Sequence, residues 1–151
     1  MRTSAEGVDL ETSIGYLLKE ASSALRSAME AALRPLGMTV THYACLELLA
    51  QRPGLSNSEL ARGAFVTRQS MNVLLKALER DGVVTRALEP AVGKALPTQL
   101  TARGREDLAR ATVAVRSIEE QMLADLGDAD RETAWRILAT FVRSLGDRRE
   151  L

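Results

Sequence analysis

Cysteine, histidine and aromatic residues are scarce in this sequence, whose 151 residues include one cysteine, one histidine and 3% aromatics. Cys45 has no second cysteine for an internal disulfide and no set of partners for a zinc cage. No apolar run reaches the roughly 18 residues of a membrane-spanning helix, and residues 1–10 lack the basic and apolar regions of a signal peptide. We therefore expect a cytoplasmic protein that has no structural metal and does not enter a membrane.

The residue patterns of common enzyme chemistries are also missing. Nucleophilic catalysis needs a nucleophile beside a base, metal catalysis needs a ligand cage, and phosphate transfer commonly uses a glycine-rich loop. The sequence contains none of these patterns, and its carboxylates are scattered over polar helix faces. We therefore predict that the protein is not an enzyme and has no cofactor.

The formal net charge is zero, but the charges are unevenly distributed. Residues 56–105 carry eight basic and four acidic side chains, which leaves twelve basic and sixteen acidic side chains for the flanks. A basic middle between acidic flanks is typical of a confined phosphate-binding face. Chance produces such a distribution too, so charge alone does not identify the partner.

Apolar residues at three- and four-residue steps predict helices over most of the chain. The first covers residues 10–32 and stops near Pro35, and the second is capped by Thr39 or Thr41 and ends before Pro53. Because the second segment is apolar on almost every side, we expect it to be buried.

Two further helices follow in quick succession. Ser56 and Glu59 fit the reciprocal capping box, which predicts a short helix over residues 57–63. The next helix starts at Thr67 and stops at the Asp81-Gly82 pair. Its apolar stripe, which should face the core, consists of Met71, Leu74, Leu75 and Leu78.

The remainder of the chain combines a β-ribbon with two helices. Residues 83–100 start with β-branched side chains and contain two prolines and a glycine, which predicts two short strands, about 83–88 and 96–100. Thr101 then opens a helix that closes at Gly127, and Asp128 caps the last helix. The predicted fold is mainly α, in the order helix, helix, helix, helix, ribbon, helix, helix.

The helices on either side of residues 64–66 form a helix-turn-helix arrangement, in which the second helix enters the DNA major groove. With the apolar stripe facing the core, the outward side chains are those of Arg68, Gln69, Asn72, Val73, Lys76 and Arg80. Arg and Lys can bond guanine, Gln and Asn can bond adenine bidentately, and Val can touch a thymine methyl. A solvated polar face is the alternative, but no acidic residue lies between Ala61 and Leu78.

Other side chains complete the predicted interface. Thr67 and Ser70, at the helix start, can hold phosphates. Arg86 on the first strand can take another phosphate, and Lys94 near the ribbon tip can reach a minor groove, although an ordinary exposed lysine explains Lys94 equally well. The full predicted DNA-binding set is Ser56, Thr67, Arg68, Gln69, Ser70, Asn72, Val73, Lys76, Arg86 and Lys94.

Four motifs in this order make the chain resemble the MarR family of bacterial regulators over nearly its whole length. They are Leu60-Ala61, Val66-Thr67-Arg68-Gln69-Ser70-Met71, Leu78-Glu79-Arg80-Asp81-Gly82-Val83-Val84 and Leu100-Thr101-Ala102-Arg103-Gly104-Arg105. One departure lies in the wing, where the family usually has an acidic residue and an arginine close together near the tip. Here, in residues 89–94, only Lys94 matches in charge.

The resemblance implies a winged helix-turn-helix homodimer that binds a pseudo-palindromic operator in double-stranded DNA and represses transcription. It divides the single chain (1–151) into a DNA-binding lobe, residues 39–100, and dimerisation helices, residues 8–36 and 101–147. The amphipathic patterns agree with this division, since these long helices carry more apolar surface than so small a lobe can cover.

Relatives of this kind often release DNA when a small aromatic acid binds. By position, the effector would contact Tyr16, Leu17, His42, Cys45 and Leu46, although each of these is also explained as a packing residue. Two alternatives use the same fold. A thiol redox sensor would rely on Cys45, which has no adjacent Lys or Arg to lower its pKa, and a protein-interaction module would need a less basic recognition face.

Overall fold

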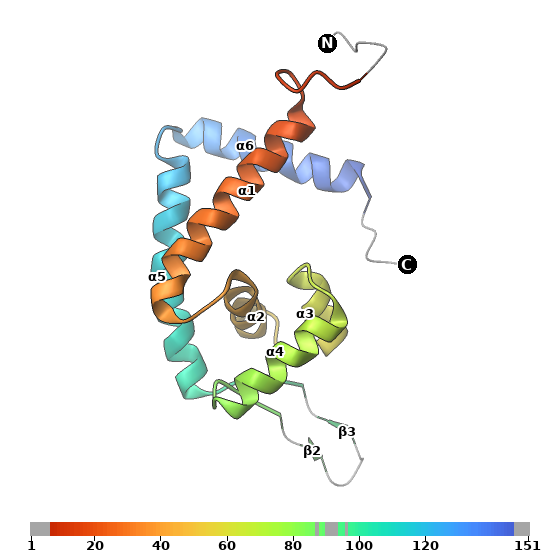
Figure 1. The fold of residues 1–151 in the computed structure, drawn as a ribbon, viewed down its shortest axis with the longest axis vertical. Coiled ribbons are helices and arrows are strands. Elements are labelled where there is room, and N and C mark those ends of the chain that lie inside the picture. Colours follow the sequence, from red (N-terminus) through yellow and green to blue (C-terminus); the bar gives the residue numbers. More distant parts are fainter. Residues whose placement is uncertain (1–6, 87, 90–93, 96, 147–151) are drawn as a thin grey trace.

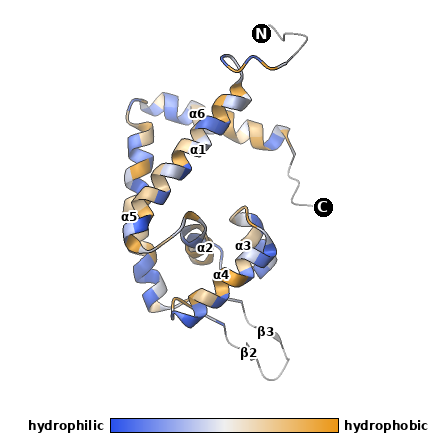
Figure 2. Ribbon diagram, in the orientation of Figure 1, coloured by the Kyte–Doolittle hydropathy of each residue, from blue (hydrophilic) through white to orange (hydrophobic). Residues whose placement is uncertain are grey.

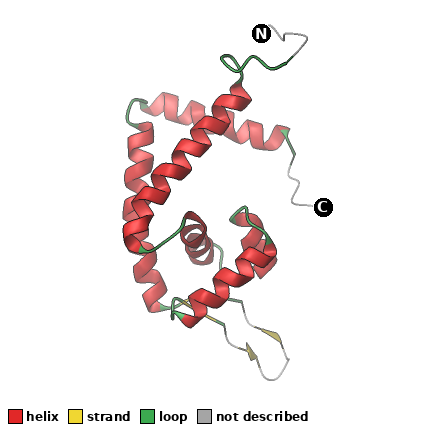
Figure 3. Cartoon of the chain, viewed as in Figure 1, coloured by secondary structure: helices red, strands yellow, loops and turns green. Residues whose placement is uncertain are grey.

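The computed structural model describes residues 7–86, 88–89, 94–95 and 97–146, and these form a mainly helical chain with a small β-ribbon (Figure 1). The helices are α1 (Ile14–Leu33), the 3-10 helix η1 (Arg34–Leu36), α2 (Val40–Gln51), α3 (Asn57–Gly63), α4 (Arg68–Arg80), α5 (Ala102–Leu123) and α6 (Asp128–Ser144). This is the predicted order and the predicted winged-helix architecture. Figure 3 shows the strands confined to the segment between α4 and α5.

Most helices begin at a hydroxyl residue, as the sequence predicted for all of these except the first. In each case the side-chain oxygen accepts a hydrogen bond from the backbone N–H three residues later, which satisfies one of the free donors of the first turn. These caps are Ser13, Thr39, Ser56, Thr67 and Thr101. The capping box of α3 is complete, because Glu59 also accepts from the Ser56 backbone N–H.

Three predicted helix ends were wrong. The first helix starts at Ile14 rather than Leu10, because Ser13 supplies the cap and a turn closed from Thr12 to Asp9 precedes it. The last helix is capped by Gly127, and Asp128 is its first residue, where its charge is favourable beside the helix N-terminus. Similarly, α5 ends at Leu123, earlier than the predicted stop at Gly127.

The ribbon lies where the sequence placed it, but it consists of two short antiparallel pairs instead of the two predicted strands, and Lys94 belongs to a strand. At its root, β1 (Val84–Thr85) pairs with β4 (Gln99–Leu100), and farther out β2 (Leu88–Glu89) pairs with β3 (Lys94–Ala95). Figure 1 shows β2 and β3 projecting away from the helices, as a wing does. The wing is therefore attached to the lobe through β1 and β4.

The hydrophobic core belongs to the lobe formed by α2, α3, α4, the ribbon root and the adjoining parts of α1 and α5. Its fully buried large side chains are Leu33, Cys45, Leu46, Leu60 and Met71. The predicted stripe of α4 faces this core, with Leu75 and Leu78 also buried and Leu74 packed against it. Burying a leucine contributes about 2 kcal/mol, so these contacts fix which side of α4 faces outward.

A second group of apolar side chains remains exposed on α1 and α6. No residue of α6 is buried, and Trp135 is 73% exposed. Figure 2 shows hydrophobic residues along both helices. The exposed large hydrophobics of this apolar face are Ile14, Tyr16, Leu17 and Leu18 on α1 and Trp135, Ile137, Leu138 and Val142 on α6, with Leu145 just after α6. Exposure of this many large apolar side chains on two helices is typical of a protein interface.

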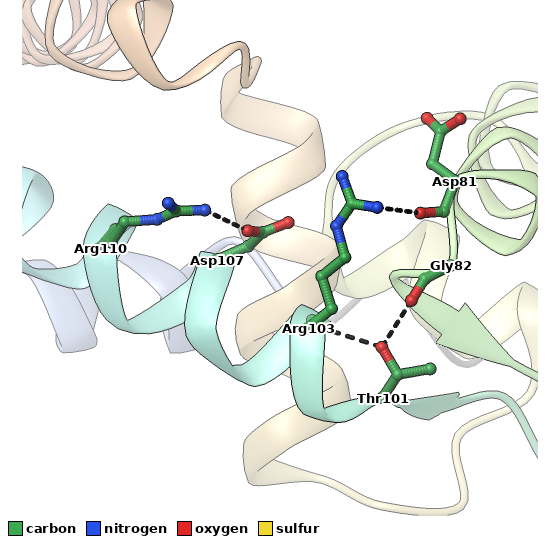
Figure 4. A network of polar contacts seen from close by, with 7 residues as sticks. Asp81, Gly82, Thr101, Arg103, Asp107 and Arg110 are labelled. Atoms are coloured by element: carbon green, nitrogen blue, oxygen red, sulfur yellow. Dashed lines mark hydrogen bonds and ion pairs between the residues drawn. The ribbon is translucent and has the colours of Figure 1, made fainter.

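The lobe is joined to α5 by a set of hydrogen bonds at the C-terminal end of α4 (Figure 4). The Thr101 hydroxyl, which caps α5, shares its one proton between the backbone oxygens of Gly82 and Val83, at 2.6 and 3.0 Å. The Arg103 guanidinium donates to the Asp81 backbone oxygen at 3.0 Å. The start of α5 is therefore fastened to the end of the candidate recognition helix.

Candidate DNA-binding face

The outward face of α4 carries most of the side chains that the sequence predicted there. Arg68, Gln69 and Lys76 are exposed, and Val73 is 65% exposed although it is apolar. Asn72 differs because it is half-buried and hydrogen-bonded within the lobe. The exposed set combines cationic, amide and methyl groups, which match the three kinds of contact that distinguish base edges.

The N-terminus of α4 is held by its own first turn. Thr67 Oγ1 accepts from the Ser70 backbone N–H at 3.1 Å and donates to Ser70 Oγ at 2.9 Å. These two hydroxyls, predicted to hold phosphates, therefore bond to each other in the DNA-free protein. A helix leaves other first-turn N–H groups without intrahelical partners, and these remain suited to an anion.

The turn before α4 sets its angle to α3. The Val66 N–H donates to the Ala61 oxygen at 3.0 Å and the Phe65 N–H donates to the Arg62 oxygen at 3.2 Å, the two bonds of a Schellman motif. Such a motif places one residue in the left-handed region, usually glycine, and here Phe65 occupies it with φ 59°. Its side chain is 81% exposed beside the start of the recognition helix.

Ser56 lies at the N-terminus of α3, where its side chain is exposed but already caps the helix. Its oxygen accepts from the Glu59 backbone N–H at 3.2 Å, and its own N–H donates to the Glu59 carboxylate at 3.0 Å. The hydrogen bonds from Ser56 lower the pKa of Glu59 and keep it charged. The predicted DNA contact of Ser56 would therefore compete with its capping role.

A relay of hydrogen bonds connects the wing root to the recognition helix, and sequence reasoning missed two of its members. Arg86 on the chain after β1 donates to Thr98 Oγ1 from Nε and Nη2, at 3.2 and 3.0 Å, and Nη2 also donates to Asn57 Oδ1. Asn57 Nδ2 donates in turn to Asn72 Oδ1 at 2.9 Å. Thr98 is only 5% exposed. The hydrogen-bonded partners are 12 to 29 residues apart in the sequence, so no local sequence pattern predicts them.

A cleft of about 230 Å³ lies beside this relay, between α4 and the ribbon root. Its lining is mostly polar and consists of Asn57, Asn72, Leu75, Lys76, Glu79, Val84, Arg86 and Thr98. Asn72 and Arg86, both predicted to bind DNA, therefore line the cleft, and both are hydrogen-bonded to Asn57. Lys94 belongs to β3, and its side chain lies outside the described part of the structure.

The predicted effector residues differ in how far they are buried. Tyr16 and Leu17 are exposed near the start of α1, whereas Cys45 and Leu46 have no exposed surface and belong to the core. A ligand that contacted Cys45 or Leu46 would have to displace the packing around them, and their effector contact stays a prediction. His42 is half-buried. Burial lowers the pKa of its imidazole, while the nearby carboxylates of Asp107 and Asp81 act to raise it.

An apolar cavity lies between the two long helices α1 and α5, lined by none of the predicted effector residues. It measures about 290 Å³, opens between α1 and α5, and is lined by Ala21, Ala24, Leu25, Ala28, Ile118, Gln121 and Met122. Gln121 is the polar member of this lining. The sequence could not have indicated this cavity, because α1 and α5 are brought together only by tertiary packing.

Cys45 is unsuited to redox sensing. Burial raises the pKa of its thiol to about 12, and the reactive species of a cysteine is the thiolate. We expect iodoacetamide at pH 8 to modify Cys45 in the native protein at least about a hundred times more slowly than in guanidinium chloride. Mass spectrometry over time measures both rates, and comparable rates would restore the redox alternative.

Metal and membrane sites receive no support from the described residues. Within residues 7–86 and the described segments that follow, no group of three or more His, Cys, Asp or Glu side chains is placed to hold a metal ion. Likewise, none of the described helices is both long and apolar enough to cross a membrane.

Comparison with known proteins gives consistent matches. The profile of the MarR family matches residues 36–95. The HTH-type transcriptional repressor Rv2887 of Mycobacterium tuberculosis is 45% identical over 120 residues, which cover 80% of this chain and 86% of that protein. A crystal structure of Rv2887 with DNA has a TM-score of 0.71 at 42% identity, covering 86% of this chain and 98% of that one. Its complex with salicylic acid has a TM-score of 0.75 at 40% identity, covering 92% and 100%.

Proposed function

The chain belongs to the MarR family, and from this premise we propose that it is a sequence-specific DNA-binding repressor of transcription. The observation that carries the proposal is the outward face of α4, where Arg68, Gln69, Val73 and Lys76 are exposed. Without an acidic residue between Ala61 and Leu78, this face is suited to the phosphates and base edges of a major groove. The similarity to a repressor crystallised with DNA supports the same proposal.

The repressor acts as a homodimer in this proposal. Residues 39–100 form the DNA-binding lobe, and residues 8–36 and 101–147 provide the dimerisation helices. The exposed apolar face of α1 and α6 supports this division, since a second copy would remove it from water. Two lobes related by a twofold axis would place their recognition helices about 34 Å apart, one turn of DNA.

A small aromatic acid is the proposed effector that releases the operator. Salicylic acid is bound in one of the similar structures. In this chain the cavity between α1 and α5 is apolar with Gln121 as a polar group, which suits an aromatic ring carrying one polar substituent. The cavity lies between helices assigned to the dimer, so occupancy there would alter the spacing of the two lobes.

Binding to a DNA duplex across a salt series, with and without salicylate, tests the function. We expect affinity to fall steeply with salt, because phosphate contacts release counterions, and to fall further with salicylate. Fluorescence anisotropy with the region upstream of the protein's own gene provides the measurement. If no sequence-specific binding occurs at any salt concentration, the protein is instead an interaction module of the same fold.

The Arg68→Ala variant is expected to lose roughly 1 to 3 kcal/mol of operator binding and to discriminate less between bases. Arg68 is exposed in the first turn of α4, so removing its side chain leaves the core untouched. Lys94→Ala is the comparison, and we expect it to weaken binding to all sequences alike, as loss of a backbone contact does. Normal binding by Arg68→Ala in gel shifts would contradict the assignment of the reading face.

A further inference from the structure

The relay between the wing root and α4 has a direction that its chemistry imposes. A guanidinium has N–H donors and no acceptor, so the atom of Asn57 that faces Arg86 must be its carbonyl oxygen. The Asn57 amide nitrogen then faces Asn72 and can only donate, and the Asn72 atom that receives it must be Oδ1. Arg86 thereby determines the orientation of an amide on another helix.

This orientation limits what Asn72 can offer to DNA. An asparagine that recognises adenine bidentately presents both its oxygen and its nitrogen to one base edge. Here Asn72 Oδ1 is held by Asn57 at 2.9 Å inside the lobe, which leaves the Nδ2 donors for an external partner. Lys76, one turn farther along α4 and lining the same cleft, is also a donor.

We propose that Arg86, acting through Asn57, fixes Asn72 as a donor that recognises hydrogen-bond acceptors on the base edge, above all those of guanine. Guanine presents two acceptors in the major groove, N7 and O6, whereas adenine presents a donor beside its N7. Arg86 is then a positioning residue, and Asn72 does not read adenine as its residue type alone suggested. This inference rests on the proposed DNA-binding function.

Substitution of Asn57 tests the relay because one variant removes its hydrogen bond to Asn72 and another reverses the direction of that bond. Asn57→Ala frees the Asn72 amide to rotate, and Asn57→Asp presents only acceptors, so that Asn72 must turn its nitrogen inward and its oxygen outward. Ser58→Asp is the control, since it adds the same charge one residue away and outside the relay. Circular dichroism confirms that each variant is folded.

The probe is a duplex selected by the parent protein from a library with a randomised central region. The base pair read by residue 72 is the one whose preference disappears in Asn72→Ala. At that position the parent should prefer guanine to adenine roughly tenfold. The ratio of the two affinities, from anisotropy titrations, should approach one in Asn57→Ala, shift toward adenine in Asn57→Asp and stay unchanged in Ser58→Asp.

Two results would overturn the inference while leaving the repressor function intact. One is a parent preference for adenine at the position sensitive to Asn72→Ala, or no such position at all. The other is an unchanged guanine-to-adenine ratio in both Asn57 variants. If the parent selects no sequence from the library, both the proposed function and this inference fail.

Discussion

Replacing Gly104 by alanine is expected to destabilise the fold by about 3 kcal/mol, lowering the melting temperature by roughly 10 °C. Gly104 lies in the first turn of α5, where an added Cβ would come within 2.2 Å of the Val83 backbone oxygen. That oxygen cannot retreat easily, because it accepts hydrogen bonds from the Thr101 N–H and hydroxyl. The methyl group would therefore push α5 away from the end of α4, the junction drawn in Figure 4.

Gly15→Ala is the matched control for this prediction. Gly15 also lies in the first turn of a long helix, but its nearest neighbour for an added Cβ is Ser13 Oγ at 3.9 Å. Alanine is favoured over glycine in a helix by up to about 1 kcal/mol, so this variant should be as stable as the parent or more stable. Urea and thermal denaturation measure both, and equal stability of Gly104→Ala and the parent would refute the close contact.

A charge placed in the apolar face of α6 should abolish the proposed dimer and most of the operator affinity. Leu138 is a large exposed hydrophobic side chain on α6, and Leu138→Glu would bury a carboxylate between two copies. A monomer reaches one half-site and loses the advantage of linked binding, which amounts to about 10²- to 10⁴-fold. Light scattering with size exclusion measures the mass, and anisotropy measures the affinity.

The control for Leu138→Glu is Arg136→Glu, because Arg136 is exposed on α6 and is not part of its apolar face. It should remain dimeric. Trp135 is the single tryptophan and is 73% exposed in one chain, so its emission should shift to shorter wavelength on dimerisation and stay long in Leu138→Glu. A parent that is monomeric at all concentrations, or a Leu138→Glu variant that stays dimeric, would contradict the proposed interface.

Much of the local structure was predictable because its causes lie within a few residues. Serine and threonine caps sit three residues from the amides they bind, and apolar stripes repeat within one helix. The outward position of Arg68 and Lys76 followed directly from the inward position of Met71 and Leu75. One wrong helix end, Asp128 for Gly127, arose where two neighbouring residues were both acceptable caps. The start predicted at Leu10 followed the apolar periodicity past the true cap at Ser13.

The candidate site was only partly predictable for the same reason. Asn72 and Arg86 were assigned to DNA by residue type, yet in the structure they are linked through Asn57, which comes from a different helix. By contrast, the burial of Cys45 was predictable from its apolar segment. The relay was not predictable, because its partners are distant along the chain.

The sequence by itself determined the helical class, the starts of the four helices from α2 to α5, the place of the ribbon and the outward face of α4, because periodicity and capping act over short range. The tertiary structure alone decided that Arg86 reaches Asn57, that Gly104 touches the Val83 oxygen, and that α1 and α5 enclose an apolar cavity. These arrangements arise when the burial of leucines in one core brings distant segments together, and only then do their polar groups find partners.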